Sequence, residues 1–248
     1  MTSSDDKVLL YTAKVCPYAA RAELALAIAG IPHEKFEVDL LNKPSWYAEK
    51  INKASKVPVL VTTKGETEFK LPESLVIVEY INDITGNAIF TSSSPQHRAT
   101  ARYIVERYSQ LVQPQYVATV LRREASALPA LKAALVDFNT LLKDHDAGTG
   151  AFVQGEDKFG YADLNIAPFV ARVLSASKHG LLPESDEQGV KRIDEEVDAG
   201  AEGLERVKRW WDAVQAVKAW GEVWDEQKYL APLKKRLAAI EAEKNGSK

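Results

Sequence analysis

The first 85 residues alternate between short runs of strand-forming residues and segments whose apolar positions have helical spacing. Residues 7–13 are rich in β-formers, and residues 19–29 are rich in alanine and leucine, which favour a helix. In chain order the pattern predicts strand 7–13, helix 19–29, strand 33–39, helix 45–50, strand 56–61, strand 67–70 and helix 75–83. Gly65 separates the last two strands, which read as a hairpin. The order βαβαββα predicts a small mixed α/β sheet with helices on both faces.

From residue 95 onward the apolar positions recur at helical spacing, and no strand is expected. The predicted helices span residues 96–123 with a kink at Pro114, then 128–143, 160–178, a tryptophan-rich stretch at 204–224, and 227–243. Gly160 is the expected N-cap of its helix, with Asp163 at the third helical position. Residues 184–202 carry eight acidic side chains against two basic ones and are interpreted as a solvated excursion rather than a binding site.

Together these patterns predict two domains. Residues 1–85 form the α/β domain, residues 86–94 a linker, and residues 95–248 an all-α domain. A chain of 248 residues with 46% hydrophobic content can build the cores that this division requires.

Charge and composition narrow the function. The formal net charge of −3 gives no electrostatic case for binding nucleic acid or an anionic membrane. The first residues lack the pattern of a secretion signal, and no apolar run is long enough to span a membrane, so a cytoplasmic location is expected. One cysteine cannot form an intramolecular disulfide, and four scattered histidines lack metal-ligand spacing, so no metal site is expected.

The single cysteine, Cys16, lies where the first strand meets the first helix. Pro17 follows it and suits the first turn of a helix, which places Cys16 at or next to the N-cap. There the helix dipole favours a thiolate and can lower a cysteine pKa from ~8.5 to roughly 3.5–7.5. The alternative is that Cys16 is one more small buried hydrophobic residue. We favour a nucleophile, because a chance cysteine would seldom fall at this junction.

Pro58 opens the third strand and removes one donor from the sheet. We favour a cis Val57-Pro58 bond, which would shape a tight turn and leave the Val57 backbone able to pair with another molecule. A trans proline on an edge strand is the alternative.

Four features together resemble a glutathione transferase over nearly the whole chain. They are Cys16-Pro17-Tyr18 at the first helix, Val57-Pro58 before the third strand, Glu73-Ser74 before the helix that follows, and the all-helical second half. Within that family, Cys16-Pro17-Tyr18 and the stretch at residues 42–46 are most similar to the omega class, including its fungal members.

The resemblance implies a thioredoxin-like domain that binds glutathione as a co-substrate, with Cys16 as the catalytic residue. Lys43 would meet the glycyl carboxylate, the Val57 backbone the cysteinyl unit, and Glu73 with Ser74 the γ-glutamyl end. The implied glutathione-binding residues are Pro17, Tyr18, Lys43, Lys56, Val57, Pro58, Glu73 and Ser74.

The same resemblance implies a homodimer and a second-substrate site in the helical domain for a hydrophobic or glutathionylated small molecule. The candidates for that site are Tyr108, Tyr116, Trp210 and Trp224. For the tryptophans, a place in the hydrophobic core is the commoner outcome and a wall of the ligand site is the other.

Three functions are compatible with this sequence. The first is a glutathione-dependent thiol transferase or reductase, which must use a monothiol cycle because Ala19 stands where a dithiol enzyme has its second cysteine. The second is a ligandin-type binding protein for planar hydrophobic compounds. The third is a non-enzymatic interaction module, which the presence of Lys43, Glu73 and Ser74 beside Cys16 disfavours.

Overall fold

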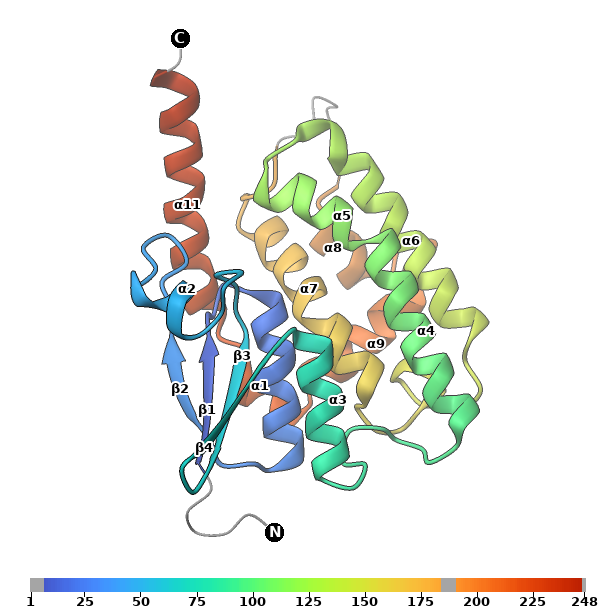
Figure 1. Ribbon diagram of the computed structural model, residues 1–248. Helices are drawn as coiled ribbons and strands as arrows, with labels where there is room; N and C mark the ends of the chain where they lie inside the picture. Colours follow the sequence, from blue (N-terminus) through green and yellow to red (C-terminus); the bar gives the residue numbers. More distant parts are fainter. Residues whose placement is uncertain (1–6, 184–190, 247–248) are drawn as a thin grey trace. The chain divides into compact units, whose positions relative to one another are not determined.

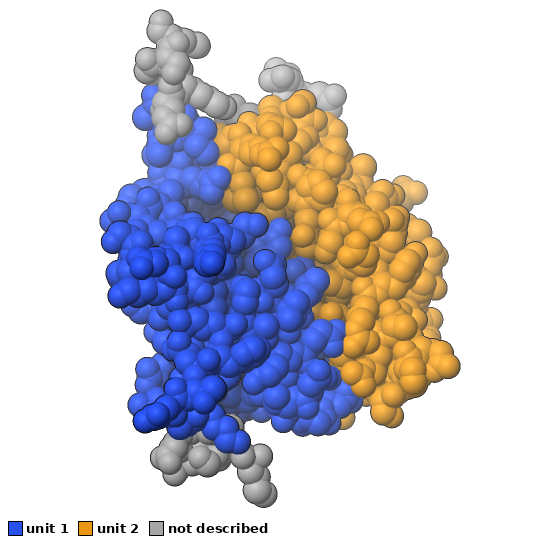
Figure 2. All heavy atoms as spheres, viewed as in Figure 1, with its two compact units in different colours: residues 1–89, 222–248 blue, residues 90–221 orange. Residues whose placement is uncertain are grey.

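A computed structural model describes residues 7–183 and 191–246 of the protein. The chain forms two compact units, coloured separately in Figure 2: unit 1 holds Met1–Ile89 and Glu222–Lys248, and unit 2 holds Phe90–Gly221. This differs from the expected division, in which residues 95–248 form one domain. Residues 222–248 belong with unit 1 because they contact it; for example, the Val223 carbonyl accepts a hydrogen bond from Lys14. Within the described ranges, no helix is both long and apolar enough to cross a membrane.

Unit 1 is built on a four-stranded sheet in the order β2-β1-β3-β4 (Figure 1). β1 and β2 are parallel, while the β1–β3 and β3–β4 pairs are antiparallel. The elements are β1 (Lys7–Thr12), α1 (Pro17–Ala29), β2 (Glu34–Glu37), α2 (Trp46–Lys50), β3 (Val59–Lys64), β4 (Thr67–Pro72), α3 (Ser74–Ile84) and, from the end of the chain, α11 (Glu226–Gly246). The predicted βαβαββα order and the mixed thioredoxin-like sheet are confirmed.

Alternating side chains fill the two faces of this sheet. Tyr11, Val59 and Val61 pack with Tyr47 of α2 in one cluster. Leu10 and Leu60 pair across β1 and β3, are almost fully buried, and face the opposite side because strand side chains alternate. There α1 and α3 lie side by side (Figure 1). Helices therefore cover both faces, as the sequence pattern predicted.

All the regular secondary structure among the described residues of unit 2 is helical. Its elements are α4 (Pro95–Leu111), α5 (Gln113–Tyr116), a π-helical turn (Val117–Leu121), 3₁₀ turns (Ala125–Ala127 and Val153–Gly155), α6 (Leu128–Asp144), α7 (Tyr161–Lys178), α8 (Ile193–Ala199), α9 (Glu205–Gln215) and α10 (Lys218–Val223), which crosses into unit 1. The helix expected at residues 96–123 is not one kinked helix. It ends at Leu111 and resumes as α5, whose first turn holds Pro114, because a proline lacks the N–H that a helix interior needs.

The core of unit 2 surrounds α7. Every residue of α7 from Tyr161 to Ser177 is buried, so this helix is enclosed on all sides. Around it, the ring of Phe138 packs edge-on against Tyr108 at 4.9 Å and Trp210 at 5.7 Å between centroids. Edge-on contacts are a favoured arrangement for buried aromatic rings.

A buried carboxylate fixes the start of α7. Asp163 Oδ1 accepts hydrogen bonds from the Val153 N–H at 2.9 Å and the Trp210 indole N–H at 2.7 Å, and Oδ2 accepts from the Gly160 N–H at 2.9 Å. The expected N-cap at Gly160 is confirmed. Burial raises the pKa of Asp163 to about 6, although the three donors oppose that rise. One side chain thus joins a loop, a helix start and α9.

The acidic segment at residues 184–202 is only partly as expected. Residues 184–190 lie outside the described residues, but α8 follows and buries Ile193, Asp194 and Val197. The Ser177 hydroxyl donates to Asp194 Oδ1 at 2.6 Å, and Arg192 pairs with Oδ2 of the same carboxylate at 2.9 Å. This part of the segment is therefore packed structure rather than a solvated excursion.

Candidate active site

Cys16 is the N-cap residue of α1, with extended backbone angles of φ −85° and ψ 117°. Its N–H donates to the Ala13 carbonyl at 2.9 Å, which closes a turn over residues 13–16, and Pro17 occupies the first turn of the helix. The side chain is partly exposed. The predicted strand-to-helix placement is confirmed, and the positive end of the α1 dipole lies next to the sulfur.

The Val57-Pro58 turn lies beside this cysteine. The peptide bond is cis, as predicted. The Cys16 Sγ is 4.0 Å from the Val57 carbonyl oxygen, although 41 residues separate the two in sequence. The fold therefore brings the Cys16 sulfur close to the backbone that leads into β3.

A second group of predicted residues gathers at the start of α3. Ser74 is buried, and its hydroxyl oxygen accepts a hydrogen bond from Arg21 of α1 at 3.4 Å. The Arg21 guanidinium also lies 5.4 Å from the centre of the Tyr18 ring. Tyr18 is 37% exposed, so part of its side chain is accessible to solvent. Arg21 thus contacts both Tyr18, two residues after Cys16, and the Ser74 hydroxyl.

Glu73 has an unusual backbone. Its φ of 74° and ψ of 112° fall outside the regions that side-chain-bearing residues normally adopt. Such a conformation costs on the order of 1–3 kcal/mol and is found most often at ligand-binding and active sites. Glu73 is exposed and immediately precedes α3, so its carboxylate and the α3 N-terminus share one edge of unit 1.

Lys43 and Lys56 lie on the segment that contains α2. The Lys43 ammonium donates to the Ser55 carbonyl at 2.6 Å. The Lys56 carbonyl accepts from the Tyr47 hydroxyl and from the Asn52 side-chain amide, both at 3.0 Å. These bonds hold residues 43–56 as one structured loop that leads into the Val57-Pro58 turn.

Besides burial, the charge of Cys16 contributes to the raised pKa values of two tyrosines. Burial raises the pKa of Tyr47 well above its ordinary value, and the Cys16 charge adds to the rise. Burial also raises the pKa of Tyr18, with Arg21 opposing and Cys16 adding. Both hydroxyls are therefore protonated at neutral pH, and neither competes with Cys16 as the anionic group.

Of the four residues expected at a second-substrate site, three are buried in unit 2 and one belongs to unit 1. Tyr108, Tyr116 and Trp210 are at most 1% exposed within unit 2, and Trp210 is bonded to Asp163. Side chains with no accessible surface are core residues, so the assignment of Tyr108, Tyr116 and Trp210 to a ligand site is wrong, and Trp210 has the core position that is commoner for a tryptophan. Trp224 belongs to unit 1, is partly exposed, and packs on Tyr229 at 5.5 Å between ring centres.

Arg21 was not singled out from the sequence. A signal was present, because Arg21 and Glu23 are the two charged residues in an otherwise apolar helix, and both are buried. A buried charge in an apolar segment indicates a specific partner. Across residues 7–183 and 191–246, no group of three or more His, Cys, Asp or Glu side chains is arranged to hold a metal ion.

The first part of the chain matches a known protein family, and most of the chain matches a known relative. A family model described as "Glutathione S-transferase, N-terminal domain" matches residues 10–88, which include Cys16, Val57 and Ser74. The probable glutathione transferase omega-2 of Caenorhabditis briggsae is 30% identical over 180 residues, which is 71% of this chain and 67% of the relative. The chain belongs to the glutathione transferase family. Members of this family use glutathione as co-substrate, so the protein is a glutathione transferase enzyme.

Solved structures match nearly the whole of this chain. Glutathione transferase Omega 1C from Trametes versicolor is 30% identical, has a TM-score of 0.80, and covers 95% of this chain and 98% of its own. Omega 2S from the same organism, solved with 2,4-dihydroxybenzophenone, is 26% identical with a TM-score of 0.78, covering 93% of this chain and 99% of its own. The resemblance to the omega class is confirmed, as is the helical second half of the fold.

Proposed function

We propose that the enzyme is a glutathione-dependent thiol transferase in which Cys16 is the nucleophile. The observation that carries the proposal is the position of Cys16 at the N-cap of α1, 4.0 Å from the Val57 carbonyl. A helix N-terminus stabilises a thiolate, and a thiolate exchanges disulfides. Serine or tyrosine in this place would instead activate the thiol of glutathione for conjugation.

The proposed cycle needs one protein thiol and two glutathione units. The Cys16 thiolate attacks the glutathionyl sulfur of a substrate disulfide, so a Cys16–glutathione disulfide forms and the substrate leaves as a thiolate that takes a proton. A second glutathione, as thiolate, attacks this mixed disulfide. Oxidised glutathione is released and the Cys16 thiolate is regenerated, so the two electrons that reduce the substrate come from glutathione.

The charges of glutathione match the groups arranged around Cys16. Glutathione carries two carboxylates and one ammonium. Lys43 would bind the glycyl carboxylate, the Val57 backbone the cysteinyl unit, and Glu73 with Ser74 the amino and carboxylate groups of the γ-glutamyl end. Because Arg21 donates to the Ser74 oxygen, the hydroxyl hydrogen remains available to a carboxylate. Pro17, Tyr18, Lys56 and Pro58 would shape the surrounding surface.

A ligandin-type binding function is the second candidate. One observation favours it: a related omega enzyme, Trametes versicolor Omega 2S, was solved in complex with an aromatic compound, 2,4-dihydroxybenzophenone. The burial of Tyr108, Tyr116 and Trp210 removes three of the side chains expected to hold such a ligand. Trp224 remains as a partly exposed aromatic residue.

Intact-protein mass spectrometry after incubation with oxidised glutathione tests the catalytic proposal. We expect one adduct of glutathione mass on the wild-type enzyme, its loss on adding reduced glutathione, and no adduct on Cys16→Ser. Cys16 is the single cysteine, so the variant is a complete control. A wild-type enzyme that forms no adduct but binds 2,4-dihydroxybenzophenone would support the binding function instead.

We also propose that the enzyme is a homodimer. Val76 is 50% exposed, Tyr80 lies one turn along α3, and Phe69 of β4 is 45% exposed and packs on Tyr80 at 5.6 Å between ring centres. An apolar strip of this kind is typical of an interaction surface. Light scattering should give about twice the chain mass of 27.4 kDa, and Val76→Asp should shift it toward the single-chain mass. A single-chain mass for the wild type would contradict the proposal.

A further inference from the structure

Lys14 lies two residues before Cys16, inside the turn that carries the cysteine. Its backbone N–H donates to Glu37 Oε1 of β2 at 2.6 Å. Its ammonium donates to Glu23 Oε2 of α1 at 2.7 Å and to the Val223 carbonyl at 3.2 Å. Val223 is 209 residues away in sequence. One side chain therefore joins the Cys16 turn, the first helix and the segment that enters α11.

Glu23 is the buried centre of this arrangement. Its carboxylate is 1% exposed, accepts from Thr12 Oγ1 at 2.7 Å, and pairs with both Lys14 and Lys35 at 2.7 Å. Burial by itself raises the pKa of this carboxyl, but Lys14, Lys35 and Thr12 outweigh it and leave the pKa below its ordinary value. The carboxylate is thus ionised at neutral pH and holds both lysines in place.

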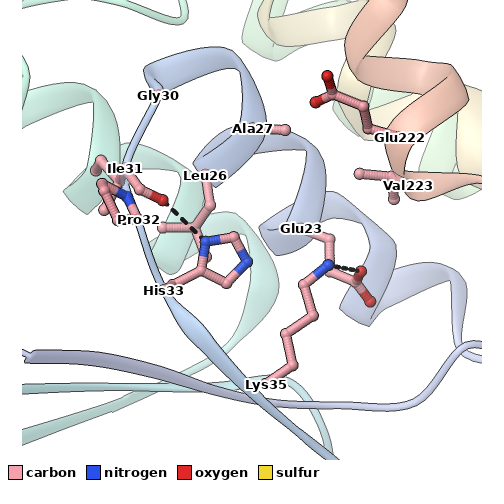
Figure 3. A pocket seen from close by; sticks show the side chains of 10 residues that line it. All are labelled: Glu23, Leu26, Ala27, Gly30, Ile31, Pro32, His33, Lys35, Glu222 and Val223. Atoms are coloured by element: carbon pink, nitrogen blue, oxygen red, sulfur yellow. Dashed lines mark hydrogen bonds and ion pairs between the residues drawn. The ribbon is translucent and has the colours of Figure 1, made fainter.

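The contact between α1 and residues 222–223 is not a continuous packed surface. A pocket of about 370 Å³ lies between them, with Leu26 and the Glu23–Lys35 pair on one wall and Glu222 and Val223 on the other (Figure 3). Missing contact area removes dispersion and hydrophobic stabilisation. The hydrogen bond from the Lys14 ammonium to the Val223 carbonyl is one polar connection across this partly open contact.

We propose that Lys14 is the positioning residue of the Cys16 turn, and that it transmits the position of residues 222–225 to the nucleophile. This inference rests on the proposed role of Cys16. When Lys14 is bonded to Glu23 and Val223, the turn at residues 13–16 is held at its second residue, and Cys16 stays at the N-cap of α1. When residues 222–225 move away, the ammonium loses the Val223 carbonyl as an acceptor and the turn is held less firmly.

Charged groups face Lys14 from several neighbouring elements, and Glu222 lines the adjoining pocket. Lys14 faces Glu23 on α1, Glu37 and Lys35 on β2, and Asp225 on the segment before α11. The backbone N–H of Lys228 is the main cause that lowers the pKa of Asp225, and the Lys14 ammonium adds to it. Around Cys16 itself, the titratable groups are Tyr18 and Tyr47 with the Arg21 cation nearby.

Lys35 provides a matched control, because it makes the same 2.7 Å ion pair with Glu23 but belongs to β2 and not to the Cys16 turn. The test compares iodoacetamide alkylation of Cys16 from pH 5 to 9.5 in wild type, Lys14→Gln, Lys14→Arg and Lys35→Gln. At pH 6 we expect Lys14→Gln to react about tenfold more slowly, as an apparent thiol pKa one unit higher would give. Lys35→Gln should stay within about twofold of wild type, and Lys14→Arg should recover most of the rate.

At pH 9.5 all four proteins should react at similar rates, because every thiol is then ionised. Equal slowing of Cys16 alkylation in Lys14→Gln and Lys35→Gln would overturn the inference. It would mean that Lys14 acts only as an ion-pair partner of Glu23. If the wild-type thiol titrates near 8.5, the proposed function fails separately, and that result does not depend on Lys14.

Hydrogen exchange gives a second readout that needs no reactive thiol. In Lys14→Gln, peptides covering residues 13–16 and 222–225 should both exchange faster than in Lys35→Gln. If Lys14→Gln does not fold, hydrogen exchange of the wild type at increasing denaturant replaces it. The peptides covering residues 13–16 and 222–225 should then open with the same free energy. Different values for the two peptides would contradict the transmission of movement from residues 222–225 to Cys16.

Discussion

Replacing Asp163 with alanine is expected to lower the free energy of unfolding by about 3 kcal/mol at pH 7.5. The substitution leaves the N–H groups of Val153, Gly160 and Trp210 without their acceptor in a buried place. Each orphaned buried donor costs about 1–3 kcal/mol. Relief of the buried charge offsets part of this sum, since the raised pKa shows that ionised Asp163 is itself disfavoured. Guanidinium unfolding followed by circular dichroism measures the difference.

The pH dependence of that difference identifies its cause. Asp163 has a folded pKa of about 6, above its ordinary value of 3.8, so the folded protein binds more protons than the unfolded chain between these values. The stability from this group is therefore greatest below about pH 4 and is lost as the pH rises through 6. At pH 5 the wild type should exceed the variant by roughly 1 kcal/mol more than at pH 7.5.

Asp157→Ala is the matched control, because Asp157 is exposed in the same part of the chain. It should change stability by no more than about 0.5 kcal/mol. If Asp163→Ala behaves like Asp157→Ala, the carboxylate does not organise the start of α7.

Substitution of Lys43 or Glu73 is expected to weaken glutathione binding by about tenfold or more, with little effect on the Cys16 thiol. Both residues would contact parts of the tripeptide that are remote from its sulfur. A hydrogen bond to a charged group contributes about 1.5–3 kcal/mol, and 1.4 kcal/mol corresponds to tenfold in affinity. Lys43→Ala and Glu73→Gln remove one charge each, and the glutamine keeps the size of the side chain at the strained position.

Isothermal titration with glutathione, combined with alkylation rates for Cys16, separates binding from thiol reactivity. Lys53→Ala and Glu66→Gln are the controls, since both residues are exposed and neither is a predicted site residue. Because the Lys43 ammonium also bonds Ser55, the melting temperature of Lys43→Ala must stay near that of wild type for the comparison to hold. Unchanged affinity in both site variants would refute the assignment of these residues to glutathione.

Much of unit 1 follows from short stretches of sequence. The apolar run before Cys16, the proline after it and the alanine-rich segment predict a strand, an N-cap and a helix, because each depends on residues within a few positions. The cis Val57-Pro58 bond and the β3–β4 hairpin were predicted for the same reason. In unit 2, the helical spacing and the carboxylate at Asp163 were enough to locate α6 and the start of α7.

Only the tertiary structure decided which aromatic residues are core and which long-range pairs form. Periodicity shows that Tyr108, Tyr116 and Trp210 face inward, but an inward face can line a site or fill a core, and the packing of Phe138 and Phe169 against them settles the difference. The Arg21–Ser74 bond spans 53 residues and the Lys14–Val223 bond spans 209. No local sequence pattern predicts either hydrogen bond. A buried charge needs a partner, but the residues near it in sequence do not indicate which distant residue the fold will bring to it.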